Sequence, residues 1–497
     1  MLRALCSCHN LRECQQPAAQ RHGRKAADSS DRPPSPRRAS SRNRRLPLCT
    51  VVRLPPVGLL PLLASLALSA SAAATTERQV CQRFDFGTGR VASDWVAVRV
   101  DTTYTTDRGF GLEPGATVVG IDRATGHPER SDFLTSDRPF HFTARVAGDG
   151  NYRVSVTLGD AEAATHATIK AELRRLVIEA VHTNPGELKT VSFIVNVRTP
   201  QIAAGPGVPA GAVKLKAPRE TVQEAWAWDD AITLEFSNRR PAVCAVVIEP
   251  VNVPTVFLLG DSTVCDQSKE PYASWGQMLP AFFKSTVAIA NHGESGETYR
   301  DSLRRRRLDK VVSSLRPGDW VLLQFGHNDQ KQIAAGTGGP ATTYKAEIRQ
   351  HVEAIRAHGG TPVLLSPMER RGFEADGRVM PSLIAYADAA REAARELGVA
   401  FIDLNAASRR FYEALGPERS AAAFAAPNGV IDNTHHNNYG AYELAKCIVQ
   451  AIRDQHLPLA AHLNEGWTPF DPAHPDDPTT FAVPASGAFT NERPLGD

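Results

Sequence analysis

The sequence predicts an α/β domain built on a parallel sheet, preceded by an antiparallel β-sandwich. Residues 254–455 alternate short apolar runs with stretches of helical periodicity, which is typical of a parallel sheet covered by helices on both faces. Residues 78–250 contain short β-rich runs without helical stretches between them, as in antiparallel sandwiches. The chain has 497 residues, of which 42% are hydrophobic, so it is long enough for both cores.

Five apolar runs are expected to form the parallel sheet, because each is short and ends in polar or turn-forming residues. They occupy residues 256–259, 287–290, 320–325, 361–366 and 399–404. Helical periodicity covers 300–315, 344–358 and 381–397, and Gly359 and Gly398 are placed to end the last two of these helices.

The sandwich is expected from β-rich runs separated by Gly, Asp, Asn and Pro. These runs cover residues 152–158, 190–197, 231–236 and 245–248. Trp95, Trp226 and Trp228 could stack on sugar rings if exposed, but packing inside the sandwich or against the next domain is the favoured interpretation.

Polar residues follow the first three strands of the expected parallel sheet. Gly260, Asp261 and Ser262 follow the first, a Gly-bearing loop at 291–298 follows the second, and Gly-His-Asn-Asp at 326–329 follows the third. Far downstream, Asp432 and His435 lie three residues apart, just before the helical pattern at 439–446. Because parallel strands end at one edge of a sheet, we expect all of these residues to meet there.

As a set, these motifs resemble the SGNH (GDSL-type) hydrolase superfamily, and within it the rhamnogalacturonan acetylesterases of the carbohydrate esterase family twelve type. The resemblance covers residues 254–455. The motifs that carry it are Gly-Asp-Ser-Thr-Val at 260–264, Ser-Trp-Gly-Gln at 274–277, Asn-His-x-x-Ser-Gly at 291–296 and Phe-Gly-His-Asn-Asp at 325–329. The resemblance implies a flavodoxin-like three-layer α/β/α fold. The sequence Phe-Asp-Phe-Gly at 84–87 and the layout of the first domain resemble the galactose-binding-like modules that precede such esterases.

The resemblance also implies the roles of the site residues. Ser262 would be the nucleophile, His435 its base and Asp432 the group that orients His435. The Ser262 and Gly296 N–H groups and the Asn328 side chain would form the oxyanion hole. Such a site hydrolyses esters by moving the serine proton through the imidazole to the leaving alcohol, and it needs no cofactor and no metal.

The remaining polar residues of these motifs have weaker assignments. Trp275, Glu297 and His436 are candidate substrate contacts, and Glu297 stands where the family often has Arg or another bulky residue. Other interpretations compete: Ser262 could merely cap the following helix, and His436 could replace His435 as the base. We assign no catalytic role to the remaining polar residues, His292, His327 and Asp329, of which Asp329 is interpreted as a loop-fixing acceptor.

The basic run at 304–307 lies inside the expected helix 300–315. Consecutive residues spread around a helix, so a solvated surface is the default interpretation, with a polyanion site through Arg305 and Arg306 as the alternative.

The N-terminal segments are expected to lie outside the folded protein. Residues 1–53 carry 12 Lys and Arg against 3 acidic residues and should not fold by themselves. Residues 54–74 hold an apolar run followed by small residues, the pattern of a secretory signal peptide. The segment before the apolar run is unusually long for a signal peptide, and no Met lies between Met1 and Met278. We therefore expect translation to start at a non-Met codon near Val51 or Val52, and the basic segment 1–53 to be a gene-model artefact.

Without residues 1–53 the chain has 44 basic and 51 acidic residues, a net charge of about −7, so nucleic acid is not an expected partner. We expect a secreted or periplasmic protein without a stable membrane anchor, because the apolar run is shorter than the roughly 20 residues that span a bilayer. Nothing in the sequence indicates the oligomeric state. Residues 456–497, rich in Pro, Asp and Gly, are expected to form an extended tail on the surface.

Of the 8 cysteines, four precede the expected cleavage site. Cys81 and Cys244 lie near opposite ends of the sandwich segment and could form a disulfide in an oxidising compartment, whereas Cys265 and Cys447 are expected to be free.

The leading functional hypothesis is a secreted serine esterase that removes acetyl groups from plant cell-wall polysaccharide, with acetylated rhamnogalacturonan as the expected substrate. Two alternatives remain: the same site acting on acetylated xylan or a lipid ester, and a carbohydrate-binding protein whose esterase domain is inactive.

Overall fold

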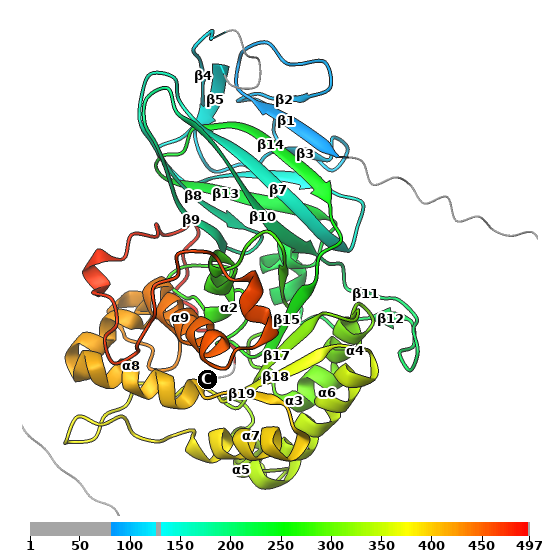
Figure 1. Ribbon diagram of the computed structural model, residues 1–497, viewed down its shortest axis with the longest axis vertical. Coiled ribbons are helices and arrows are strands. Elements are labelled where there is room, and N and C mark those ends of the chain that lie inside the picture. The colour runs from blue at the N-terminus through cyan, green and yellow to red at the C-terminus, as the bar shows by residue number, and fades with distance from the viewer. Residues whose placement is uncertain (1–80, 126–130, 496–497) are drawn as a thin grey trace, which may run out of the picture. The chain divides into compact units, whose positions relative to one another are not determined.

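The computed structural model describes residues 81–125 and 131–495 (Figure 1). The segments predicted as 1–53 and 54–74 lie outside the described residues. All described residues belong to one compact unit.

The first domain is a β-sandwich of two sheets. One has the strand order β10-β7-β14-β1-β2, with β5 beside β14 and β4 beside β5, and the other has the order β3-β6-β13-β8-β9. All neighbouring strands are antiparallel except β1 and β2, which are parallel. The bounds are β1 Gln82–Phe86, β2 Val96–Val98, β3 Phe110–Leu112, β4 Val119–Asp122, β5 Asp132–Thr135, β6 Phe140–Arg145, β7 Gly150–Gly159, β8 Thr165–Ala171, β9 Arg175–Thr183, β10 Leu188–Val197, β13 Ala231–Arg240 and β14 Val243–Pro250. The two inner faces form one core rich in phenylalanine, including Phe86, Phe142 and Phe236.

Residues 198–230, here called the linker, connect β10 and β13 of the sandwich and contact the second domain. The linker includes the short hairpin of β11 (Gln201–Ile202) and β12 (Gly211–Ala212), and its residues 213–228 run back toward the sandwich before β13 begins.

The second domain contains a five-stranded parallel sheet of order β16-β15-β17-β18-β19. The strands are β15 Thr255–Gly260, β16 Ala288–Asn291, β17 Trp320–Gln324, β18 Thr361–Leu365 and β19 Ala400–Ile402. Alternate residues of each strand enter different cores: Leu258 and Leu322 lie in one, Phe257 and Leu323 in the other. Both faces of the sheet are therefore buried, which explains why the strands are apolar throughout.

Helices cover both faces of this sheet, so the expected three-layer fold is confirmed (Figure 1). The core on one side includes residues of α2 (Trp275–Met278), α8 (Leu404–Arg419) and α9 (Asn438–Asp454). The core on the other side includes residues of α4 (Arg307–Val312), α6 (Lys345–Ala357) and α7 (Ile384–Leu397). The shorter helices α3 (Tyr299–Arg304) and α5 (Lys331–Ala334) complete the set. Gly398 ends α7 in the left-handed conformation, as predicted.

The prediction of a single helix over residues 300–315 is wrong. Helix α3 ends at Arg304, and Arg306 adopts φ 63° before α4 begins. The basic run therefore straddles a break rather than surrounding one helix. The Arg307 side chain is 1% exposed and its Nη2 donates to Glu220 Oε2 at 2.6 Å.

The other arginines of this run also have protein partners. Arg305 donates to the Lys214 carbonyl at 3.0 Å, and Arg306 donates to the Pro209 carbonyl at 2.5 Å. These contacts attach the linker to α3 and α4, so the structure does not favour the polyanion site considered for Arg305 and Arg306.

The tryptophans considered as sugar platforms have different surroundings. Trp228 is 8% exposed and packs in the α4 and α6 core, where its Nε1 donates to Glu220 at 3.0 Å. Trp226 contacts His141, and Trp95 is half-buried. Trp228 thus follows the favoured interpretation of packing between the domains.

A disulfide between Cys81 and Cys244 is excluded by the strand register. Asp85 of β1 lies opposite Ala245 of β14, which places Cys244 opposite Phe86, so Cys81 is displaced from Cys244 by five residues, roughly 17 Å, along the strand pair. Disulfides need Cα atoms within about 7 Å of each other. Cys265 and Cys447 are free thiols, as expected.

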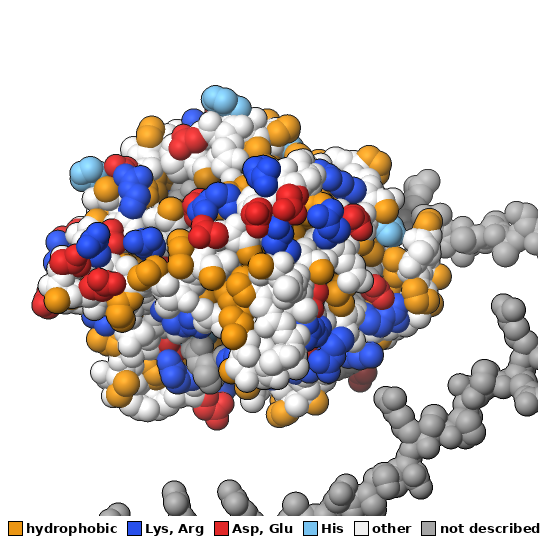
Figure 2. All heavy atoms as spheres, turned by 90° about the horizontal axis from the view of Figure 1, so that it is seen from below, with side chains coloured by type: hydrophobic (Ala, Val, Ile, Leu, Met, Phe, Trp, Pro, Cys, Tyr) orange, Lys and Arg blue, Asp and Glu red, His pale blue; other side chains and the backbone are white. Residues whose placement is uncertain are grey.

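Figure 2 shows basic and acidic side chains intermingled over one face, with apolar side chains scattered among them. Within the described part of the chain, no helix is long and apolar enough to cross a membrane.

Candidate active site

Ser262 follows the carboxyl end of β15, where the chain turns sharply out of the sheet. The turn requires glycine at position 260, because a Cβ there would lie 2.5 Å from the Gln324 carbonyl oxygen of β17. Asp261 fixes the turn, since its Oδ1 accepts from the Thr263 N–H at 3.0 Å and the Thr263 hydroxyl at 2.7 Å.

The side chains of Ser262, His435 and Asp432 form one continuous hydrogen-bonded chain. His435 Nε2 lies 2.8 Å from Ser262 Oγ, and His435 Nδ1 lies 3.0 Å from Asp432 Oδ2. These partners assign the tautomer in which Nδ1–H donates to the carboxylate and Nε2 accepts from the serine hydroxyl. All three residues are at most 3% exposed. The structure therefore brings together residues 173 positions apart, in the arrangement that proton transfer from the serine requires.

The Asp432 carboxylate is held on both oxygens. Its Oδ1 accepts from the N–H groups of Thr434 and His435 at 2.9 and 3.0 Å, and its Oδ2 accepts from His435 and from Arg493 Nε, each at 3.0 Å. Burial alone would raise the pKa of Asp432, but the hydrogen bonds from His435 and Arg493 outweigh it and hold that pKa below its ordinary value. The carboxylate is therefore ionised at neutral pH.

The loop after β16 lies beside the turn at Ser262. The Glu294 N–H donates to the Gly260 carbonyl at 2.9 Å, and Gly296 adopts φ 74°, a conformation that favours glycine. Asn328, after β17, donates its Nδ2 to the Glu297 carbonyl at 3.3 Å. Asn328 therefore lies next to the loop that carries Gly296.

All three candidate substrate contacts are buried and have partners within the protein. The structure therefore does not support their assignment as substrate contacts. Trp275 Nε1 donates to Gln324 at 2.7 Å, and Trp275 is 0% exposed. The fully buried Glu297 lies 3.0 Å from Lys216 Nζ, and it also faces Arg305 and Arg307. Glu297 thus attaches the Gly296 loop to the linker and to α3 and α4, which accounts for an acid at this position.

His436 does not compete with His435. Its Nε2 lies 2.8 Å from the Tyr412 hydroxyl, and it is 2% exposed. Burial, and next the neighbouring His435, lowers the pKa of His436 to about 3, so its ring is neutral. It is a structural histidine.

The unassigned polar residues also lie in the interior. His327 Nδ1 lies 3.4 Å from Oδ2 of Asp261, the residue before Ser262. Burial, and next the Asp261 charge, raises the pKa of Asp329 well above its ordinary value. His292 lies away from the triad, beside a cavity described below.

The β-sandwich contributes two arginines to the support of the active-site loops, which sequence reasoning missed. Between β8 and β9, Arg174 donates to the carbonyls of Gln267 and Tyr272 at 3.0 and 2.8 Å, and Arg175 pairs with Asp266 at 2.6 Å. Both arginines are at most 5% exposed. They hold the loop that follows Ser262, and no local motif marks them.

The C-terminal tail, also missed, lies against the site. Glu270 pairs with the tail through its backbone, and its Oε1 accepts from the Ser486 N–H at 2.9 Å. Beyond this anchor, Arg493 reaches Asp432, and Leu495 lies next to Gly296, where a Cβ on the glycine would be 3.3 Å from the leucine. The sequence predicted a tail on the surface, but nothing in it indicated which surface.

Within residues 81–125 and 131–495, no group of three or more His, Cys, Asp or Glu side chains is arranged to hold a metal ion.

One class of ester hydrolases is defined by a parallel α/β sheet with Gly-Asp-Ser at a strand end. In this class a histidine is hydrogen-bonded to the serine, and an acid is hydrogen-bonded to the histidine. The GDSL-like lipase/acylhydrolase family matches residues 258–441, and the galactose-binding domain-like family of β-agarase/YXIM esterases matches residues 82–197. Rhamnogalacturonan acetylesterase RhgT of Bacillus subtilis (strain 168) is 37% identical over 219 residues, which are 42% of this chain and 93% of that protein. The chain therefore belongs to the GDSL-like lipase/acylhydrolase family and is a carboxylic ester hydrolase.

Two further comparisons extend over both domains. The uncharacterized esterase YxiM of the same strain is 27% identical over 387 residues, 75% of this chain and 91% of that protein. The crystal structure of YxiM from Bacillus subtilis covers 76% of this chain and 99% of its own, at 24% identity and a TM-score of 0.41. The expected resemblances, to SGNH hydrolases and to galactose-binding-like modules, are confirmed by the two family matches.

Proposed function

We propose that this protein is a secreted serine esterase that removes acetyl groups from rhamnogalacturonan, with Ser262, His435 and Asp432 as its catalytic triad. The observation that carries the proposal is the hydrogen-bonded chain from Ser262 Oγ through His435 to Asp432, at 2.8 and 3.0 Å. The substrate class is supported by the similarity to RhgT, and secretion by the apolar segment at 57–68 with its small-residue cleavage pattern.

In the proposed reaction, His435 Nε2 removes the Ser262 proton as Oγ attacks the acetyl carbonyl carbon. The resulting imidazolium keeps Nδ1–H on Asp432 and is stabilised by that carboxylate. When the tetrahedral intermediate collapses, Nε2–H protonates the sugar oxygen, the alcohol leaves and an acetyl-serine remains. A water molecule, deprotonated by His435 Nε2, then attacks this ester. The bond between the acyl carbon and Ser262 Oγ breaks, His435 returns the proton to Oγ, and acetate leaves.

The oxyanion of the intermediate would be bound by the N–H groups of Ser262 and Gly296 and by Asn328 Nδ2. In the structure, Asn328 Nδ2 makes a 3.3 Å hydrogen bond to the Glu297 carbonyl, which is long and easily exchanged for a charged acceptor. Leu495 lies next to Gly296 and narrows the space around the Gly296 N–H group. A small acyl group such as acetyl suits such a site.

The test compares acetate release by the full chain and its Ser262→Ala variant from acetylated rhamnogalacturonan, acetylated xylan and nitrophenyl acetate. Ser155→Ala is the matched control, because Ser155 lies on the sandwich, where its hydroxyl group forms a hydrogen bond with the hydroxyl group of Ser192. We expect Ser262-dependent release from rhamnogalacturonan and from the small ester. Release from xylan instead would refute the substrate class, and equal activity of Ser262→Ala would refute the triad.

A further inference from the structure

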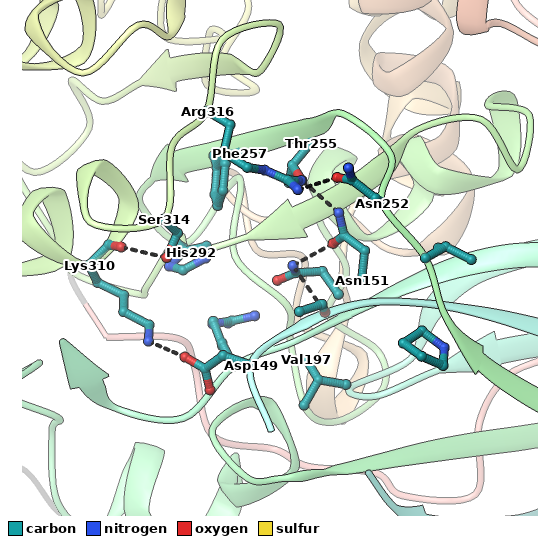
Figure 3. Close-up of a pocket in the computed structure, with 15 residues that line it drawn as sticks. Asp149, Asn151, Val197, Asn252, Thr255, Phe257, His292, Lys310, Ser314 and Arg316 are labelled. Atoms are coloured by element: carbon teal, nitrogen blue, oxygen red, sulfur yellow. Dashed lines mark hydrogen bonds and ion pairs between the residues drawn. The ribbon is translucent and has the colours of Figure 1, made fainter. Parts of the chain in front are cut away.

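A cavity of about 600 Å³ opens between the β-sandwich and the amino end of the parallel sheet (Figure 3). Its lining includes Asn151 of β7, Arg198 just after β10, and Thr255 at the start of β15. Ser262 follows the opposite end of β15 and is not among the lining residues. The cavity is therefore separate from the candidate active site, and its volume falls within the range of small-molecule sites.

The lining carries more positive than negative charge. Its cations are Arg198, Lys310 and Arg316, and its single carboxylate is that of Asp149. Lys310 Nζ contacts Asp149 Oδ2 at 2.5 Å, as Figure 3 shows, so this carboxylate is already neutralised by a cation. Arg316 lies 3.9 Å from Asp319, which is not a lining residue, and among the described residues no salt bridge forms at Arg198. Arg198 is therefore the cation of the wall that favours an anion.

Arg198 is the most unusual of these cations. It is 5% exposed, and its Nε and Nη1 atoms are buried without a hydrogen-bond partner in the described part of the protein. Its guanidinium carbon lies 4.5 Å over the Trp228 ring. Desolvation lowers the pKa of Arg198 to about 9, because it outweighs the charges of Asp266 and Glu172, which stabilise Arg198 from nearby, and the aromatic contact that adds to them.

His292 adds a second unsatisfied group. It is 2% exposed, and neither ring nitrogen has a hydrogen-bond partner among the described residues. Burial, and next the Arg198 charge, holds the pKa of His292 well below its ordinary value, so the ring is neutral. Both ring nitrogens are buried, so the ring borders the cavity without presenting them to it. Asparagine side chains, such as Asn151 and Asn252 in Figure 3, supply further polar groups on the same wall.

We propose that this cavity binds an acidic saccharide unit, with Arg198 facing the carboxylate and the asparagines facing the hydroxyl groups. A cationic group surrounded by neutral donors and acceptors matches a uronate, which carries one carboxylate among several hydroxyls. The proposal goes beyond the proposed function and does not rest on it, because none of these residues takes part in the ester chemistry. A polymer held here as well as at Ser262 would bind with the advantage of two linked sites.

The test is calorimetric titration of the full chain with a galacturonate trisaccharide that carries no acetyl groups, so that no turnover occurs. Arg198→Met removes the guanidinium, and Asn252→Trp blocks the cavity from an exposed position at its rim. Arg304→Met is the control, because Arg304 is 73% exposed on α3 and lies outside the cavity lining. Nitrophenyl acetate hydrolysis is measured for every variant and reports the ester chemistry independently.

We expect the trisaccharide to bind about ten- to a hundredfold more weakly to Arg198→Met and to Asn252→Trp, with the control unchanged. Hydrolysis of the small ester should stay the same in all four proteins. The proposal is overturned if the wild-type protein does not bind the trisaccharide, or if both variants bind it as tightly as the wild type. Equal affinity for a neutral galactose trisaccharide, or binding of inorganic phosphate without uronate binding, would also overturn it. If Arg198→Met fails to fold, Asn252→Trp decides the question alone.

Discussion

Arg493 lies where its charge should set the pH dependence of the enzyme. Its Nε and His435 Nδ1 are each 3.0 Å from Asp432 Oδ2, so the two nitrogens are at most about 6 Å apart. Two unit charges at about 6 Å interact by about 3 kcal/mol at an effective dielectric constant of ~20. Because the Arg493 side chain is 54% exposed, solvent reduces this repulsion to about 1 kcal/mol.

The sign of the effect follows from the charges. The Arg493 cation disfavours the protonated form of His435, and only the neutral form can accept the Ser262 proton. Replacing Arg493 with Gln should therefore move the acid limb of the kcat/KM profile to higher pH by about 0.7 unit, the equivalent of about 1 kcal/mol. Asp432 remains ionised over this range, because bonds from His435 and from two backbone N–H groups persist.

The assay is nitrophenyl acetate hydrolysis between pH 4.5 and 8, at low and high ionic strength. Arg378→Gln serves as the control, since Arg378 is 73% exposed and pairs with Asp376 on an exposed loop. Salt should shrink the difference between wild type and Arg493→Gln, because the pair is open to solvent. An acid limb that stays in place, or that moves to lower pH, would refute this account of Arg493.

Two further predictions concern single side chains. Asn328→Ala should lower kcat by about two to three orders of magnitude while leaving the thermal unfolding midpoint within a few degrees of wild type, measured by steady-state kinetics and calorimetry; a loss of less than about tenfold would remove Asn328 from the oxyanion hole. Arg307→Met should lower the free energy of unfolding by about 3–5 kcal/mol, because it removes the ion-pair partner of the buried Glu220 carboxylate. Urea unfolding checks this, with the exposed Arg304→Met expected to change the same quantity by less than about 0.5 kcal/mol.

The parts of the fold that could be predicted from sequence are those with a local signal. The strand from Thr255 to Gly260 is apolar because both of its faces are buried, and its last residue must be glycine because β17 passes so close. His435 could be chosen over His436 from its spacing to Asp432 alone, since three residues place the imidazole Nδ1 on the carboxylate.

The errors arose where a side chain is satisfied by residues far away in sequence. Glu297 and Trp275 stand in motifs next to the site and were interpreted as substrate contacts, yet their partners are Lys216 and Gln324 in other elements. The break between α3 and α4 has the same origin. Arg306 adopts a left-handed conformation while its side chain bonds the linker, and helical periodicity carries no information about that contact.

The geometry of the site depends on more than the α/β domain, because ion pairs connect its loops to other segments of the chain. Three loops of the candidate site each have an acid that pairs with a cation from outside residues 254–455. Asp266, in the loop after Ser262, pairs with Arg175 of the sandwich, and Glu297, in the Gly296 loop, pairs with Lys216 of the linker. Asp432 pairs with Arg493 of the tail.

Such pairs are directional, and breaking one partner of a buried pair leaves a costly unpaired charge. The three loops are therefore held in position by the sandwich, the linker and the tail, not by the parallel sheet alone. The sheet brings Ser262, Asn328 and the Gly296 loop to one edge, and the surrounding segments fix the orientation of the loops that carry them.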